Sequence, residues 1–330
     1  MPYVKDGRWT TEAAPEVGKD GEFVRLASAF RDRITRDGSS GYPAEPGRYH
    51  LYVGYHCPWA HRTIIYRAIK GLEDAISISF CLPGFGENGW VYGTDPKAPE
   101  ATEDQINGFK YLWEAYVASD PHYTGKCTIP TLWDKQTKRI VNNESSEIIR
   151  FLNSEFVGIA GNDQDFYPEP LRSEIDEVNA FTYANINNGV YRCGFATTQA
   201  AYEEAFDALF AALDTIEARL ATRRYLVGDQ PTEADWRLFT TLVRFDVAYF
   251  SLFKCNRQQL RDFPNLWAYT RDLYAYPGVA GTVKPHLYVQ NYYSLWVNAN
   301  GIIPKGVPVD FTAPHGRERL AARRVLAEAD

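Results

Sequence analysis

Cys57 has the clearest chemical potential in this sequence, because of the residues on either side of it. An alternating, aromatic stretch at 49–55 predicts a strand, a tight turn follows, and Pro58 is typical of the first position of a helix. A cysteine at such a turn lies at the positive end of the helix dipole, near free backbone N–H groups. Both effects favour the thiolate, which is the nucleophilic form of the side chain.

The motif offers Cys57 no second thiol. Ala60 occupies the position at which a Cys-x-x-Cys motif carries its other cysteine. A disulfide formed at Cys57 therefore needs a thiol from outside to resolve it, and glutathione is the obvious candidate. We expect the neighbouring His56 to be a partly exposed bystander; the alternative is a protonated ring that further stabilises the thiolate.

Length and composition limit the classes to which the chain can belong. Its 330 residues allow two domains, and a formal net charge of −7 argues against a nucleic-acid-binding protein. The five cysteines are odd in number and widely spaced, which predicts a reducing, cytoplasmic compartment and no disulfide scaffold. The sequence contains no apolar run of membrane-spanning length and no Cys/His pair with metal-site spacing. We therefore expect neither membrane insertion nor a bound metal.

The segment 47–155 predicts a small α/β domain of the thioredoxin-like type. Its expected elements, in chain order, are strand 49–55, helix 58–70, strand 76–82, helix 106–118, strands 131–134 and 139–142, and a helix over 145–153. Pro130 enters the third strand. Proline beside a catalytic thiol at a strand entry is often cis, and we expect a cis bond here, with an ordinary trans proline as the alternative. The backbone of Ile129 would then pair with the cysteinyl part of a bound peptide.

The rest of the chain divides into an N-terminal extension at 1–46 and an all-helical domain at 165–330, whose last part, from about 286, is expected to be an extended C-terminal segment. Apolar residues of the extension, from Phe23 to Ile34, suggest one short helix. In the helical domain, Thr232 and Asp235 resemble a capping box that opens a buried helix. The Gly- and Pro-rich insertion at 83–105 is too long for an ordinary connection, which indicates a functional role.

Motifs throughout the chain resemble those of one protein family. They are 57–62, Glu87-Asn88-Gly89-Trp90, 142–150, 187–191, 194–199, 225–239, 253–256, 264–267 and 311–316. Taken together, these motifs resemble the glutathionyl-hydroquinone reductases, also called Xi-class glutathione transferases. The resemblance implies the glutathione transferase fold, in which an α/β thioredoxin-like N-terminal domain precedes an all-α C-terminal domain.

The resemblance also implies a role for each of eight residues. Cys57 is the expected nucleophile, the expected glutathione contacts are Trp90, Lys126, Ile129, Glu144 and Ser145, and the expected substrate contacts are Tyr191 and Tyr292. Glu144 and Ser145 begin a helix whose free N–H groups favour an anion; plain N-capping by Asn143 or Ser145 is the alternative. Lys126 departs from the arginine usual in the family and loses its bidentate geometry. Asn291 stands where histidine is common.

The function implied by the resemblance is reduction of glutathionyl-hydroquinones to hydroquinones. The reaction would pass through a Cys57–glutathione mixed disulfide and release oxidised glutathione, with glutathione as co-substrate, no metal, and a homodimer as the working form. One alternative is an Omega-like thioltransferase or dehydroascorbate reductase, which shares the nucleophile but not the quinol pocket. The other is a non-enzymatic ligand-binding protein on a transferase fold, against which the joint presence of Cys57, Trp90 and Glu144 speaks.

Overall fold

A computed structural model of the protein describes residues 2–12, 14, 16–295, 297–306 and 308–320. Its internal contacts form two compact units. Within the described residues, the first unit comprises Met1–Glu16, Arg25–Gln164 and His286–Trp296, and the second comprises Val17–Val24, Asp165–Pro285 and Val297–Asp330. Each unit is thus assembled from separate stretches of chain, and the N-terminal arm contributes to both.

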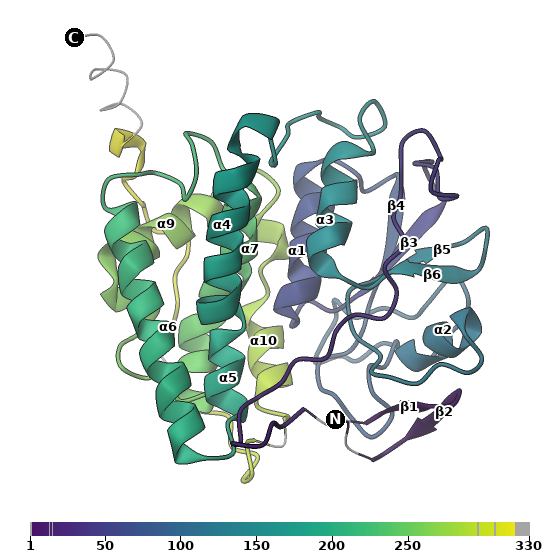
Figure 1. The fold of residues 1–330 in the computed structure, drawn as a ribbon, viewed down its shortest axis with the longest axis horizontal. Coiled ribbons are helices and arrows are strands. Elements are labelled where there is room, and N and C mark those ends of the chain that lie inside the picture. The colour runs from purple at the N-terminus through teal and green to yellow at the C-terminus, as the bar shows by residue number, and fades with distance from the viewer. Residues whose placement is uncertain (1, 13, 15, 296, 307, 321–330) are drawn as a thin grey trace. The chain divides into compact units, whose positions relative to one another are not determined.

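A four-stranded mixed sheet forms the centre of the first unit (Figure 1). Its strands are β3 (Tyr49–Val53), β4 (Ile76–Phe80), β5 (Thr131–Asp134) and β6 (Arg139–Asn142), in the spatial order β4-β3-β5-β6. β3 pairs in parallel with β4, while β5 runs antiparallel to both β3 and β6. This confirms the βαβ–α–ββ–α order predicted from the sequence, with strand ends that differ from the prediction by no more than two residues.

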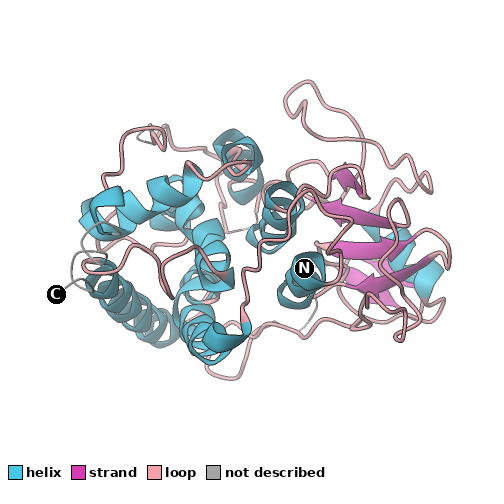
Figure 2. Cartoon of the chain, turned by 90° about the horizontal axis from the view of Figure 1, so that it is seen from above, coloured by secondary structure: helices cyan, strands magenta, loops and turns pink. Residues whose placement is uncertain are grey.

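Four helices belong to this unit or border it: α1 (Pro58–Ile69), α2 (Leu112–Ser119), α3 (Ser145–Ser154) and α10 (Pro285–Tyr292). Helix α1 packs on α3, and α2 packs beside β6, across the sheet from that pair (Figure 2). The prediction of a helix from Ile106 was wrong at its start. The backbone N–H groups of Ile106 and Phe109 donate to the Asp104 carboxylate at 3.0 Å, so this stretch wraps around a buried acid before α2 begins.

The N-terminal arm opens with a hairpin of β1 (Tyr3–Lys5) and β2 (Arg8–Thr10). The backbones of Val4 and Gly125 exchange two hydrogen bonds, of 3.0 and 2.9 Å, which fix the hairpin to the segment that leads into β5. At the hairpin turn, Gly7 has φ +72°, and a Cβ there would lie 2.0 Å from the Pro121 carbonyl oxygen. Only glycine fits this turn.

The predicted helix in the arm is absent from its described residues. Phe23 packs edge-on against Phe195 within the second unit, whereas Phe30 packs against Tyr116 within the first. The apolar side chains pack against different surfaces, so a helix would not bury them all on one face. The backbone instead bonds to other segments, as where Phe30 donates to Asn143 Oδ1 at 2.9 Å.

The second unit is helical. Its α-helices are α4 (Arg172–Thr182), α5 (Gly189–Phe195), α6 (Gln199–Leu220), α7 (Glu233–Arg244), α8 (Phe250–Leu252) and α9 (Pro264–Tyr274). Short 3-10 or π segments are Glu169–Leu171, Tyr183–Asn187, Phe245–Tyr249, Leu260–Asp262 and Ala280–Thr282.

The capped helix α7 lies in the interior of the second unit. The predicted capping box is confirmed: the backbone N–H and the hydroxyl of Thr232 donate to Asp235 Oδ2 at 2.7 and 2.9 Å. Tyr269 donates its hydroxyl to the other carboxylate oxygen at 2.7 Å. Since both oxygens of a fully buried carboxylate are hydrogen-bonded, the start of α7 is tied to α9.

Candidate active site

Cys57 is the N-cap residue of α1, as the sequence predicted. Its backbone is extended (φ −81°, ψ 123°), and its Sγ accepts a hydrogen bond from the Ala60 N–H at 3.5 Å. Sγ also lies 3.5 Å from the carbonyl oxygen of Ile129, whose bond to Pro130 is cis as expected. The sulfur is therefore held between a helix N-terminus and the segment that enters β5, where a bound peptide can reach it.

The other four cysteines lie in a different environment. Cys57 is half-buried, whereas Cys81, Cys127, Cys193 and Cys255 are buried. Burial raises the pKa of Cys81, Cys127 and Cys255 well above the usual thiol value. These three side chains stay protonated at neutral pH and Cys193 is inaccessible, so Cys57 is the candidate nucleophile.

An aromatic layer supports the cysteine segment. The prediction for His56 was wrong: its side chain is buried, and its ring stacks on Trp90 with centroids 4.8 Å apart. Phe85 packs edge-on against Trp90, with ring centroids 4.9 Å apart. A Cβ at Gly54 would lie 2.5 Å from the His56 ring, so glycine leaves the space that this ring occupies. Trp90 is thereby fixed beside the residues that precede Cys57.

Lys126 already holds a carboxylate of its own chain. Its ammonium forms an ion pair with Glu16 of the N-terminal arm, and the two side chains are only 13% and 12% exposed. Burial lowers the pKa of Lys126, while the Glu16 charge opposes that change. Glu16 was missed at the sequence level because nothing local links two residues that lie 110 positions apart.

Glu144 is the N-cap of α3, in place of the capping by Asn143 or Ser145 considered above. One carboxylate oxygen accepts from the Ser146 N–H at 3.1 Å, and the other accepts from the hydroxyl of Ser28 at 3.0 Å. Burial by itself would raise the pKa of Glu144, but these hydrogen bonds and the nearby Arg62 bring it below its usual value. Glu144 is therefore ionised and suited to an ammonium group.

Two arginines meet at Trp59, next to the nucleophile. The Arg62 guanidinium lies 4.6 Å from the centre of the Trp59 ring, and that of Arg25 lies 4.8 Å from it. Arg62 also donates to the Ser145 hydroxyl at 3.4 Å, which leaves that hydroxyl able to donate in turn. Arg62 lies inside the Cys57 motif and was within reach of sequence reasoning. Arg25 was not, since it comes from the arm.

The two tyrosines expected to face the substrate lie in different units. Tyr292, on α10, belongs to the same unit as Cys57 and is buried. The residue before it, Asn291, accepts a hydrogen bond from the Gly84 N–H at 3.0 Å and so ties α10 to the 83–105 insertion. Tyr191, on α5, belongs to the second unit. A joint role for both phenols stays a prediction.

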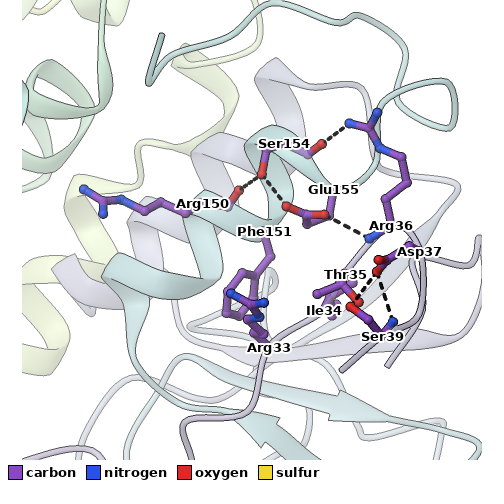
Figure 3. Close-up of a pocket in the computed structure, with 10 residues that line it drawn as sticks. All are labelled: Arg33, Ile34, Thr35, Arg36, Asp37, Ser39, Arg150, Phe151, Ser154 and Glu155. Atoms are coloured by element: carbon purple, nitrogen blue, oxygen red, sulfur yellow. Dashed lines mark hydrogen bonds between the residues drawn. The ribbon is translucent and has the colours of Figure 1, made fainter. Parts of the chain in front are cut away.

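A surface pocket of about 800 Å³ lies between the arm and the C-terminal end of α3 (Figure 3). Its lining residues are Arg33, Ile34, Thr35, Arg36, Asp37, Ser39, Arg150, Phe151, Ser154 and Glu155. Several of its polar groups bond to one another; for example, the Arg36 N–H donates to the Glu155 carboxylate at 2.9 Å. The lining contains none of the eight predicted site residues.

The described part of the chain has neither a membrane-spanning helix nor a cluster of metal ligands. No helix there has both the length and the apolar character to cross a bilayer. No group of three or more His, Cys, Asp or Glu side chains there is arranged to hold a metal ion.

Comparison with known proteins identifies the family of the chain. Residues 56–155 match the glutathione S-transferase N-terminal domain, and residues 199–272 match the corresponding C-terminal domain. The chain is 49% identical over 308 residues to the glutathionyl-hydroquinone reductase PcpF of Sphingobium chlorophenolicum, covering 93% of this chain and 96% of that protein. It is 45% identical over 327 residues to the glutathionyl-hydroquinone reductase YqjG of Escherichia coli, covering 96% and 99%.

The chain belongs to the Xi-class, glutathionyl-hydroquinone reductase family of glutathione transferases. Solved structures of this family have the same fold. The glutathione-bound structure of YqjG from Escherichia coli superposes with a TM-score of 0.88 at 43% identity, covering 96% of this chain and 99% of that one. An Xi-class transferase from Natrialba magadii gives 0.90 at 45% identity, covering 97% of each chain. The thioredoxin-like and helical architecture predicted for an Xi-class transferase is therefore confirmed.

Proposed function

We propose that this Xi-class transferase reduces glutathionyl-hydroquinones to hydroquinones, with glutathione as co-substrate. The observation that carries the proposal is the position of Cys57: a half-buried sulfur at the N-terminus of α1, with the Ala60 N–H directed at it and no cysteine at position 60. The near full-length similarity to two glutathionyl-hydroquinone reductases supports the choice of substrate.

The first step forms a mixed disulfide on the protein. The Cys57 thiolate attacks the sulfur of the glutathionyl-hydroquinone, and a bond forms between the two sulfurs. The bond from that sulfur to the ring carbon breaks, its electron pair stays on the ring, and the ring carbon is protonated. The products are free hydroquinone and glutathione linked to Cys57.

The second step regenerates the thiolate. The thiolate of a second glutathione attacks the glutathione sulfur of the mixed disulfide, releases oxidised glutathione and returns the electron pair to Cys57. Ala60 fits this cycle, because the chain supplies no resolving cysteine at that position. The two electrons that reduce the substrate come from two glutathione sulfurs, and no metal or further reductant is needed.

The polar residues around Cys57 are proposed to orient the tripeptide. Glu144, ionised and at the start of α3, pairs with the γ-glutamyl ammonium, and the Ser145 hydroxyl with the neighbouring helix N–H groups receives the γ-glutamyl carboxylate. The backbone of Ile129 pairs with the cysteinyl residue, Trp90 covers the tripeptide, and Lys126 attracts its glycyl carboxylate.

Tyr191 and Tyr292 are proposed to bind the two oxygens of the hydroquinone. Their phenolic O–H groups would donate to these oxygens and so stabilise negative charge on the departing ring. We further propose that 47–155 is the glutathione-binding domain, 165–330 the substrate domain and 1–46 an extension. The proposed working form is a cytoplasmic homodimer; its five free thiols suit a reducing compartment.

The test compares two substrates with the same enzyme. Purified protein should release hydroquinone and oxidised glutathione from glutathionyl-benzohydroquinone faster than it reduces a small mixed disulfide. A preference for the small disulfide would favour an Omega-like thioltransferase. Cys81→Ala, which removes a buried thiol, should retain turnover, and alkylation of Cys57 should abolish it; turnover that survives alkylation would contradict the mechanism.

A further inference from the structure

The pairing of Glu16 with Lys126 places a carboxylate of the chain at a proposed glutathione contact. Both side chains are largely buried, and both belong to the first unit. The Lys126 ammonium thus has two possible carboxylate partners, Glu16 and the glycyl carboxylate of glutathione. Binding of the tripeptide must therefore affect the contact with Glu16.

Other residues of the arm also contact side chains in or beside the proposed glutathione site. Ser28 donates to the Glu144 carboxylate at 3.0 Å, and Arg25 lies over the ring of Trp59. The arm thus touches the residues proposed for both ends of the tripeptide: Glu144 for its γ-glutamyl end and Lys126 for its glycyl end. Of these arm residues, only Glu16 carries the same charged group as the ligand.

We propose that Glu16 is an internal competitor for the glycyl carboxylate of glutathione, and that glutathione binds by exchange of one carboxylate for the other at Lys126. This inference rests on the proposed function, because it takes the tripeptide site as given. It adds a residue that determines affinity for the co-substrate.

Exchange is favoured over simultaneous binding for an electrostatic reason. Two carboxylates brought to one ammonium in a site shielded from water repel each other, and one of them would have to be protonated or leave. Lysine presents a single point charge, whereas arginine offers a planar fork that can engage two oxygens. Replacing one carboxylate by another keeps the Lys126 charge paired throughout, so neither state leaves a buried charge without a counter-charge.

The arm can release Glu16 without detaching as a whole. Its hairpin is fixed by the Val4–Gly125 backbone pair, and Trp9 donates its indole N–H to the Glu87 carbonyl at 2.7 Å. Trp9 also stacks on Trp113 with ring centroids 6.2 Å apart. These anchors lie N-terminal to Glu16, so the exchange needs movement of the Glu16 side chain and leaves the hairpin in place.

The test measures binding of S-methylglutathione, which has both carboxylates and the ammonium but no reactive thiol, by calorimetry on the full chain. Glu16→Gln should lower its Kd about five-fold or more, because the competing charge is removed and the competent fraction rises. Glu12→Gln is the matched control: Glu12 is an exposed arm carboxylate near Lys5, and its loss should leave Kd unchanged.

A second ligand locates the effect. The S-methylglutathione derivative whose glycyl carboxylate is a carboxamide should bind Glu16→Gln and wild-type protein equally. An unchanged or raised Kd of S-methylglutathione for a folded Glu16→Gln would overturn the exchange, and so would an equal gain for both ligands. If Glu16→Gln does not fold, Glu16→Asp, which keeps the charge but shortens its reach, should still lower Kd, and an unchanged or raised Kd would count against the proposal. None of these failures would touch the reductase proposal, which depends on the adduct at Cys57.

Discussion

The side chains around Cys57 differ in chemical character from those around Tyr191. The proposed tripeptide site relies on charged groups, with Lys126 paired to Glu16 and an ionised Glu144 at the start of α3, beside the stacked rings of His56 and Trp90. Near Tyr191, aromatic rings dominate: its ring lies 5.5 to 6.4 Å, centre to centre, from those of Phe23, Phe195, Tyr249 and Phe253.

This difference matches the two halves of the proposed substrate. Fixed charges recognise a zwitterionic tripeptide by its ammonium and carboxylates, and they discriminate strongly because an unpaired buried charge is costly. A region lined by aromatic rings binds a flat apolar group by burying its surface and matching its shape, and a tyrosine hydroxyl supplies the polar contact. Substitutions in the first region should therefore affect every glutathione-dependent reaction, and substitutions in the second only those of aromatic substrates.

The largest effect is expected from Cys57→Ser. The hydroxyl accepts the same hydrogen bond from Ala60 but forms no disulfide, so reduction of every substrate should fall by about a thousand-fold or more. Steady-state rates on a quinol conjugate and on a small disulfide measure this loss. Reduction at the wild-type rate would mean that the covalent step is wrong.

Glu144→Gln should weaken glutathione binding by about 10- to 100-fold, the usual worth of a hydrogen bond to a charged group. The loss should appear in KM for glutathione with either type of substrate. Glu147→Gln is the matched control, because Glu147 lies one turn along α3 and pairs with Arg31. Equal losses in both variants would show that only helix capping had been disturbed.

Tyr191→Phe and Tyr292→Phe should each lower turnover of glutathionyl-hydroquinones by about 10-fold, since each removes one hydrogen bond to the developing charge. Reduction of a small disulfide should change little. Tyr202→Phe serves as the control, because its hydroxyl donates to the Lys254 carbonyl at the surface of the second unit. Equal losses on both substrates would remove the proposed quinol role.

The smallest effect concerns stability in acid. His50 in β3 lies between the hydroxyls of Ser77 and Ser79, and burial lowers its pKa to about 4. His50 takes up a proton near pH 6.5 in the unfolded chain but only near pH 4 in the folded chain. The free energy of unfolding therefore falls as the pH is lowered from 6.5 towards 4. The loss should be about 2 kcal/mol between pH 7.5 and pH 5.

Denaturant unfolding of wild-type protein and His50→Gln at both pH values measures this contribution, and an identical pH dependence in the two would refute it. The second unit should respond in the opposite sense at Asp235. Burial raises the pKa of Asp235, so its charged form destabilises the folded state at neutral pH. This destabilisation is removed as the carboxylate takes up a proton at lower pH. Hydrogen exchange at β3 and at α7 separates the two responses.

Local patterns sufficed to predict much of the first unit and the cap of α7 in the second. The strand and helix around Cys57, the hairpin of β5 and β6, and the cap of α7 each depend on residues close in sequence, whose periodicity and turn chemistry are readable. The cis bond before Pro130 followed from its place at a strand entry beside the thiol.

The late start of α2 has a local cause, the hydrogen bonds from Ile106 and Phe109 to Asp104, but the other failures involve partners distant in sequence. One short helix was predicted within the arm, yet Phe23 and Phe30 pack on different surfaces. His56 was predicted to be partly exposed, because its contact with Trp90 spans a long insertion. No residue near Glu16 in the sequence indicates its role, because its partner Lys126 lies 110 residues further along the chain. Tertiary contacts decide such cases, and a single sequence does not contain them in readable form.

Mass spectrometry of the enzyme under turnover tests the central claim most directly. The protein is mixed with a glutathionyl-hydroquinone in the absence of free glutathione, quenched in acid and digested without reductant. The peptide that contains Cys57 should carry one glutathionyl group, which disappears when glutathione is added before quenching. Hydroquinone release without any adduct at Cys57 would contradict the account.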